Sequence, residues 1–225
     1  MRILAIGAHP DDVEIGMGGA ILVLRAQGHE VTVCDLTDGE PTPVGTRERR
    51  LAEAAAAAGL LGVSRITLDL PNRELVDSIP HRRAVAEVIR RVRPDILFVP
   101  YWVDAHPDHV AACALAEAAR FYAKLTHTTI PGDPVYPPRA IHFVTSHYRL
   151  ALQPTFILDI SPVIDRKLAA VRAYASQFGP ERGAEDFVDR LRDLNRYYGH
   201  LIGCAYGEPF ICREPLGLRG LDQLA

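Results

Sequence analysis

Residues 2–14 read RILAIGAHPDDVE, a short apolar run that changes to a polar cluster after Gly7. An apolar stretch rich in Ile and Leu that ends at a glycine predicts a buried β-strand. Apolar and small residues over 13–27, followed by Gly28, predict a helix, and the β-branched run 30–36 predicts a second strand. The chain therefore opens with a strand–helix–strand unit.

The same alternation continues along the chain. Further helices are expected over 46–61, 80–92, 106–124, 161–176 and 184–203, and further strands over 65–70, 95–100, 140–145, 155–160 and 209–212. This order predicts an α/β fold, in which a mostly parallel sheet is covered by helices on both faces. We expect a single domain over 1–225, with about 140–225 completing the sheet and the pocket. Residues 126–139 carry four prolines and a glycine, which predicts a loop and the candidate for a lid.

The composition excludes several classes of protein. The 225 residues carry 25 Lys and Arg against 28 Asp and Glu, a net charge of −3. This balance produces no field that would attract a polyanion, so no nucleic-acid partner is expected. No run of about 18 apolar residues lacks a charge, and the N-terminal apolar run is too short for a signal peptide, so neither a membrane span nor export is expected. Four cysteines without a C-x-x-C pair favour buried thiols in a reducing cytoplasm.

Polar groups gather where predicted strands end. AHPDDVE (8–14) follows the first strand, PNRE (71–74) the third, and DAHPDH (104–109) comes soon after the fourth. In doubly wound sheets, ligands bind at the carboxyl ends of the strands where the strand order reverses, which is expected between the first and fourth strands here. The two His/Asp motifs should therefore face each other across one crevice.

These motifs contain the ligands of a catalytic zinc site. Such a site takes about three imidazole or carboxylate ligands and keeps one position open. His9 and Asp12 supply two of them. Pro107 suits the first position of a helix, which would place His106 and His109 one turn apart, so that either histidine could be the third ligand.

The remaining groups suit hydrolysis. Asp11 would be free to accept a proton from a water molecule whose pKa zinc lowers toward ~7. The histidine that does not bind metal, with Asp108 available to hydrogen-bond it, could stabilise an oxyanion or protonate a leaving amine. Either motif alone is also compatible with a capped turn. The presence of both motifs favours a metal-dependent hydrolase.

The segment GAHPDDVEIGMGG (7–19), together with HPDH at 106–109, resembles the LmbE-like, or PIG-L, superfamily of zinc-dependent N-acetylglucosamine deacetylases. Arg50 after Gly45-Thr46, PYWVDAHPDH at 100–109 and YASQF at 174–178 are similar to the bacillithiol-biosynthesis type. The resemblance covers roughly 1–215.

The resemblance implies a Rossmann-like three-layer sandwich and a zinc ion, or another divalent metal such as Fe²⁺. It implies the following roles: His9, Asp12 and His109 as metal ligands, Asp11 as general base, and His106 as electrostatic or acid partner oriented by Asp108. The implied reaction removes the acetyl group from an N-acetylglucosamine derivative, and the branch suggests N-acetylglucosaminyl malate. The implied assembly is a homo-oligomer such as a hexamer.

Four residues are candidates for contact with this small N-acetylated aminosugar. Arg50 is implied by the resemblance, and Arg73 is a second arginine for the malate carboxylates. Asp104 stands where some relatives have a mobile tyrosine, and His147 follows a predicted strand. Glu208, near another strand end, is a weaker candidate.

Two other functions compete with deacetylation. A metal-dependent phosphoester hydrolase would favour two metals and more carboxylate ligands. A non-catalytic sugar-binding protein with a structural zinc would close all four metal positions, commonly with cysteine. None of the four cysteines lies in either motif. The helical stripe Phe187, Leu191, Leu194 and Tyr198 predicts core packing or a subunit interface.

Overall fold

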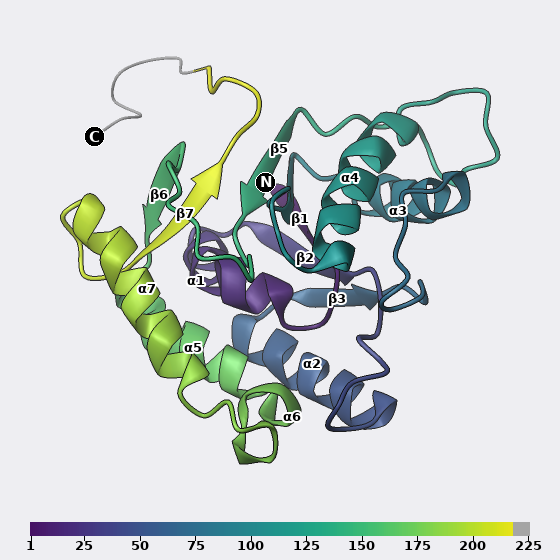
Figure 1. Ribbon diagram of the computed structural model, residues 1–225. Helices are drawn as coiled ribbons and strands as arrows, with labels where there is room; N and C mark the ends of the chain where they lie inside the picture. The colour runs from purple at the N-terminus through teal and green to yellow at the C-terminus, as the bar shows by residue number, and fades with distance from the viewer. Residues whose placement is uncertain (218–225) are drawn as a thin grey trace.

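The computed structural model describes residues 1–217 as one α/β domain (Figure 1). The strands are β1 (Arg2–Gly7), β2 (Glu30–Asp35), β3 (Ser64–Thr67), β4 (Ile96–Pro100), β5 (Arg139–Phe143), β6 (Phe156–Asp159) and β7 (Gly207–Ile211). The α-helices are α1 (Asp12–Ala26), α2 (Arg47–Leu61), α3 (Ile79–Val92), α4 (Pro107–Tyr122), α5 (Ile164–Arg172), α6 (Ala175–Phe178) and α7 (Phe187–Leu201). Within residues 1–217, none of the helices combines the length and the hydropathy that a membrane span needs.

The seven strands form one sheet in the order β3-β2-β1-β4-β5-β7-β6. β3, β2, β1, β4 and β5 are parallel neighbours, whereas β7 runs antiparallel to both β5 and β6. The mostly parallel sheet expected from the alternating elements is confirmed. The segment from β5 to β7 extends the sheet at one edge and supplies one side of the cavity described below.

Helices cover both faces of the sheet, which gives three layers (Figure 1). Side chains of β1 alternate between the faces, as the period of a strand requires. Leu4 and Ile6 pack in the cluster that contains α3 and α4. Ile3 and Ala5 pack in the cluster that contains α1. Both faces of β1 are therefore buried, which explains why its sequence is apolar from Ile3 to Ile6.

Helix α1 is interrupted by a kink at Met17, whose φ and ψ of −148° and 19° are not helical. The backbone N–H groups of Gly19 and Ala20 donate to the two oxygens of Glu208, at 2.9 and 2.6 Å. Glu208 is fully buried and forms an ion pair of 2.6 Å with Lys167, which is also fully buried. The weaker expectation that Glu208 contacts substrate is therefore wrong, because both of its oxygens are used within the fold.

The proline-rich loop over 126–139 packs beside α3 and α4, away from the cavity described below. Arg90 of α3 donates hydrogen bonds to the carbonyl oxygens of Leu125, Ile130 and Gly132. Among the described residues, those that line the main cavity include none from 126–138. The loop was a plausible lid by composition, but Arg90 fixes it beside α3 and α4.

Candidate active site

The two predicted motifs leave the sheet side by side. β1 and β4 are hydrogen-bonded neighbours, so the loops that follow Gly7 and Pro100 start at the same edge of the sheet. The first loop leads into α1 and the second into α4. The expected crevice at the reversal of strand order lies between them.

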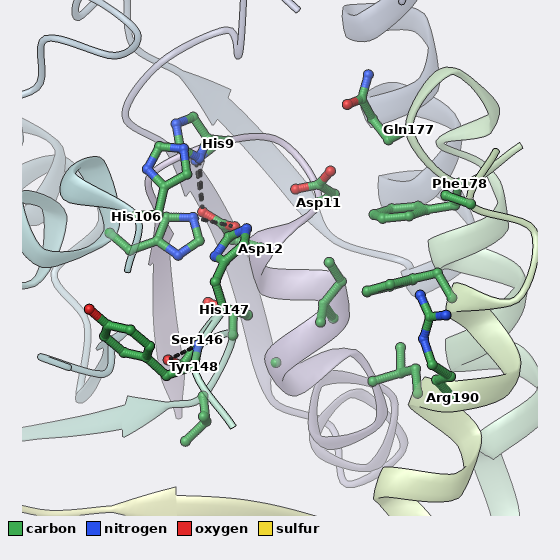
Figure 2. A pocket seen from close by; sticks show the side chains of 18 of the residues that line it. His9, Asp11, Asp12, His106, Ser146, His147, Tyr148, Gln177, Phe178 and Arg190 are labelled. Carbon is green, nitrogen blue, oxygen red and sulfur yellow. Dashed lines mark hydrogen bonds and ion pairs between the residues drawn. The ribbon is translucent and has the colours of Figure 1, made fainter. Parts of the chain in front are cut away.

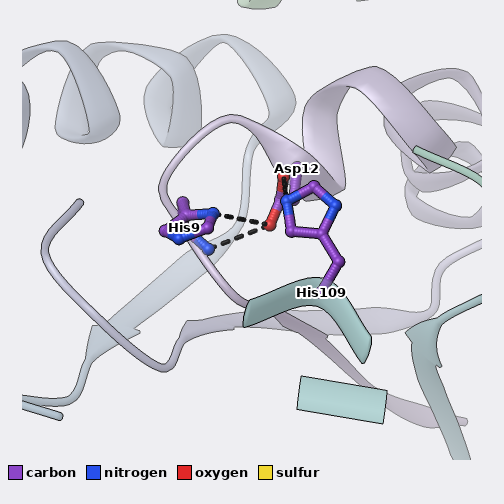
Figure 3. Close-up of side chains that lie close together, drawn as sticks. All are labelled: His9, Asp12 and His109. Atoms are coloured by element: carbon purple, nitrogen blue, oxygen red, sulfur yellow. Dashed lines mark hydrogen bonds and ion pairs between the residues drawn. The ribbon is translucent and has the colours of Figure 1, made fainter. Parts of the chain in front are cut away.

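The structure brings together His9, Asp12 and His109, the three side chains expected to bind metal (Figure 3). His109 Nε2 lies 3.2 Å from Asp12 Oδ1, and His9 Nδ1 lies 3.6 Å from Asp12 Oδ2. One donor atom from each residue lies within 4.8 Å of the others. Two imidazoles and one carboxylate fit a borderline-soft divalent cation such as zinc.

Besides Asp12, each of the two histidines contacts a further carboxylate that orients its ring. Asp108 Oδ2 lies 3.1 Å from His9 Nε2, and Asp104 Oδ2 lies 2.7 Å from His109 Nδ1. Each contact occupies one ring nitrogen and leaves the other directed at Asp12. This carboxylate–histidine arrangement is typical of metal ligands, whose tautomer and ring orientation it fixes.

Two expectations are corrected by these contacts. Asp108 was expected to orient His106 and does so only through its backbone N–H, which donates to His106 Nδ1; its carboxylate contacts His9 and accepts the backbone N–H groups of Arg73 and Leu75. Asp104 was a candidate for substrate binding, but its oxygens hold His109 and His147.

Charges in this cluster favour a cation. Burial alone would lower the pKa of His9, but Asp108 and Asp12 raise it to about 9. Burial is likewise outweighed at His109, where Asp12 and Asp104 raise the pKa to about 10. Burial would raise the pKa of Asp12, but His109 and His9 lower it well below its usual range. The carboxylates therefore stabilise positive charge where the ring nitrogens converge, whether protons or a metal ion carry it.

Asp11 lies beside this cluster, and its carboxylate is not used to cap the following helix. It precedes α1, but among the described residues its carboxylate makes no capping hydrogen bond. Its φ of 110° lies in the left-handed region, a strain on the order of 1–3 kcal/mol. Arg50 donates to Asp11 Oδ2 at 3.0 Å and to the carbonyl of Pro10 at 2.6 Å. Burial raises the pKa of Asp11 to about 6, although Arg50 opposes the shift.

His106 is positioned as a neutral hydrogen-bond donor. It caps α4, and its Nδ1 accepts the backbone N–H of Asp108 at 3.2 Å. The proton of a neutral ring is therefore on Nε2. Burial, and next the charge of His109, lower the pKa of His106 to about 4. At neutral pH this ring can donate one hydrogen bond from Nε2 to a bound ligand.

The cluster lies in a cavity of about 1020 Å³. Figure 2 shows Asp11 between the histidines and Phe178, with Arg190 on the same side as Phe178. One wall is the segment 144–152 that follows β5, and another is formed by α6 and α7. The α7 stripe expected to serve packing or an interface contributes Phe187, Leu191, Leu194 and Tyr198 to the lining. Leu194 is 49% exposed, so part of this stripe faces the open cavity.

The other candidates for substrate contact all lie at the cavity. They are Arg50, Arg73 and His147. Arg50 is buried, and its Nε and Nη1 atoms lack a hydrogen-bond partner among the described residues. Gly39 has a φ of 79°, and a Cβ there would lie 3.1 Å from Arg50 Nε, so this turn requires glycine.

A buried charge network behind Asp11 was not foreseen. Arg65 of β3 donates to Glu14 and Asp35, each at 2.6 Å, and the hydroxyl of Tyr174 donates to Glu14 at 3.0 Å. The ring of Tyr174 lies 5.6 Å from the guanidinium carbon of Arg50. The sequence held one sign of this network, since Arg65 begins a predicted strand. An arginine that is buried in a sheet requires acidic partners.

The fold and the site together define an α/β enzyme with a candidate metal centre at the switch point of a doubly wound sheet. Residues 4–120 match the family described as PIG-L, GlcNAc-PI de-N-acetylase. A diacetylchitobiose deacetylase from Thermococcus kodakarensis is 36% identical, over 92% of this chain and 81% of that protein. The chain therefore belongs to the PIG-L deacetylase family.

Two further proteins are similar to this chain. A conserved protein of solved structure, TT1542 from Thermus thermophilus, superposes with a TM-score of 0.89 at 36% identity, over 97% of each chain. A 4-oxalmesaconate hydratase from Pseudomonas putida is 29% identical, over 77% of this chain and 73% of that protein. The same fold thus accompanies two reaction types among these relatives.

Proposed function

We propose that the protein is a zinc-dependent hydrolase that removes the acetyl group from the 2-amino group of an N-acetylglucosamine derivative. The observation that carries this proposal is the convergence of His9, Asp12 and His109 beside Asp11, whose carboxylate makes no capping hydrogen bond to α1. The similarity to a diacetylchitobiose deacetylase supports the substrate class.

His9, Asp12 and His109 would hold the metal. Bound there, zinc would polarise the amide carbonyl and lower the pKa of water. Asp11 accepts the proton of the attacking water, a role that its raised pKa suits because a base is most effective with a pKa near the working pH.

His106 and Asp11 complete the reaction. His106 donates a hydrogen bond from Nε2 to the oxygen that becomes negative as water attacks. Asp11, now protonated, transfers its proton to the leaving nitrogen. Acetate and a free amine result, and Asp11 returns to its ionised form.

The cavity suits a conjugate larger than one sugar. Its volume of about 1020 Å³ lies at the upper end of the usual range for small-molecule sites. Arg73 and the partnerless donors of Arg50 supply positive charge for carboxylates. These features keep N-acetylglucosaminyl malate among the candidates, beside diacetylchitobiose.

We expect acetate release from a panel of N-acetylglucosamine conjugates. The panel contains diacetylchitobiose, N-acetylglucosaminyl malate and free N-acetylglucosamine, and released acetate is measured for each. A conjugate should exceed the free sugar in kcat/KM, because the cavity extends well beyond the metal centre. Hydration of 4-oxalmesaconate or hydrolysis of a phosphoester, without acetate release from any conjugate, would contradict the proposal.

Removal of the metal should abolish acetate release. We expect activity to disappear after chelation and to return with Zn²⁺ or, if iron is the native metal, with Fe²⁺. Asp12→Asn should lower the metal content by one equivalent per chain, because Asp12 is the only carboxylate among the three proposed ligands. Full activity after metal-free dialysis, confirmed by elemental analysis, would exclude this mechanism.

A further inference from the structure

Cys113, Glu117 and His142 form a second group of metal-ligating side chains. Cys113 and Glu117 lie one turn apart on α4, and His142 lies on the neighbouring strand β5. One donor atom from each residue lies within 4.8 Å of the others. Cys113 and His142 are buried, whereas the Glu117 side chain is 30% exposed. Three donors therefore converge between α4 and the sheet.

The contacts of His142 leave one ring nitrogen facing Glu117. Its Nδ1 lies 3.2 Å from the carbonyl oxygen of Ile211, and its Nε2 lies 3.1 Å from Glu117 Oε1. A carbonyl oxygen only accepts, so Nδ1 carries a proton. In this tautomer the lone pair of Nε2 points toward Glu117. That lone pair is the donor that a metal ion between His142 and Glu117 would use.

We propose that Cys113, Glu117 and His142 bind a zinc ion at a site separate from the active site. Thiolate, carboxylate and imidazole are all zinc ligands. With a neutral imidazole, the thiolate and the carboxylate carry the two negative charges that balance a divalent cation. The thiol proton of Cys113 is released to solvent when the metal binds.

Arg213 forms an ion pair with Glu117. Its Nε lies 3.0 Å from Glu117 Oε1, and its guanidinium carbon lies 4.3 Å from the centre of the Trp102 ring. The Arg213 side chain is 49% exposed, so it can turn toward solvent when a cation takes its place. Burial raises the pKa of Cys113 to about 12, so metal binding should strengthen as the pH rises.

The second site is linked to the first through α4. His109, Cys113 and Glu117 follow one another at intervals of four residues on this helix. At 1.5 Å per residue, each interval is about 6 Å along the axis. A metal at the second site would join α4 to β5 beyond the turn that carries His109. We therefore assign it a structural role.

The test uses Cd²⁺ and the full chain after chelation. The proposed active-site ligands are nitrogen and oxygen atoms, so a thiolate-to-metal charge-transfer band reports only on a cysteine site. We expect two equivalents of Cd²⁺ per chain and a band that saturates with one of them. Zn²⁺ added afterwards should reduce the band, because it takes the same ligands.

Matched variants locate the band. Cys113→Ser should lose the band and one equivalent of Cd²⁺. Cys34→Ser should keep both, because Cys34 is equally buried but lies outside the cluster. Asp12→Asn should lose the other equivalent and keep the band.

Two results would overturn the proposal. One is the absence of the band at Cd²⁺ concentrations that saturate the active site. The other is a band that persists in Cys113→Ser, which would place the cadmium on another cysteine. If Cys113→Ser does not fold, Glu117→Gln at the partly exposed position replaces it as the test. The proposal then requires the band to saturate at a higher Cd²⁺ concentration than in the unaltered chain.

Discussion

Asp11→Asn is expected to retain its metal and to lose about 10² to 10⁴ in kcat, the usual contribution of a general base. Asparagine has the same shape and tolerates the left-handed backbone that Asp11 adopts at a φ of 110°. It can still accept the hydrogen bond from Arg50, but it cannot accept the proton of water. The measurements are acetate release, metal content and circular dichroism.

Asp12→Asn is the matched control, because it makes the same chemical change one residue away. It should lose metal together with activity, whereas Asp11→Asn should lose activity alone. A near-native kcat in Asp11→Asn would remove Asp11 from the reaction.

The pH profile gives a further readout of the same residue. A base must be ionised, so the rate should fall as the pH drops through the pKa of Asp11, which is about 6 in the metal-free site. A bound divalent cation moves this fall to lower pH.

Glu208→Gln is expected to have the largest effect on stability. The change leaves the ammonium group of Lys167 buried without its counter-ion, and burial already lowers the pKa of that lysine. Removing one partner of a buried ion pair costs about 3–5 kcal/mol. For a domain of this size, the melting temperature should fall by roughly 6 to 20 °C. Thermal unfolding followed by circular dichroism measures the shift.

Two comparisons isolate the cause. Glu181→Gln makes the same substitution in an exposed ion pair with Arg49 and should leave the melting temperature nearly unchanged, because solvent screens an exposed pair. Lys167→Met added to Glu208→Gln removes the stranded charge and should recover part of the loss. A shift in Glu208→Gln no larger than that in Glu181→Gln would show that the buried pair adds nothing to stability.

The parallel part of the sheet was predictable because the apolar runs of β1 and β4 and the β-branched run of β2 alternate with helices. The convergence of His9 and His109 followed from the topology, since the strands before both motifs are neighbours. The second carboxylates were harder to assign. Asp104 and Asp108 lie in the same short motif, and only side-chain direction decides that they orient His109 and His9.

The cavity walls were not predictable for a different reason. Stripes of apolar residues such as Phe187 and Leu191 have the same spacing whether a helix packs on a core or lines an open site. The composition of the 126–139 segment predicted a loop and a candidate lid, yet the side chain of Arg90 binds its backbone. Contacts of this kind depend on tertiary structure and leave no local pattern.

The carboxylate of Glu208 joins segments that are far apart in the sequence. During synthesis the HPDD motif is made early, whereas Glu208, which accepts the N–H groups of Gly19 and Ala20, follows Gly19 by 189 residues. The helix that carries Asp12 can therefore reach its final form only after β7 has been made. A nascent chain released before that point would contain all three proposed metal ligands without the support that positions them.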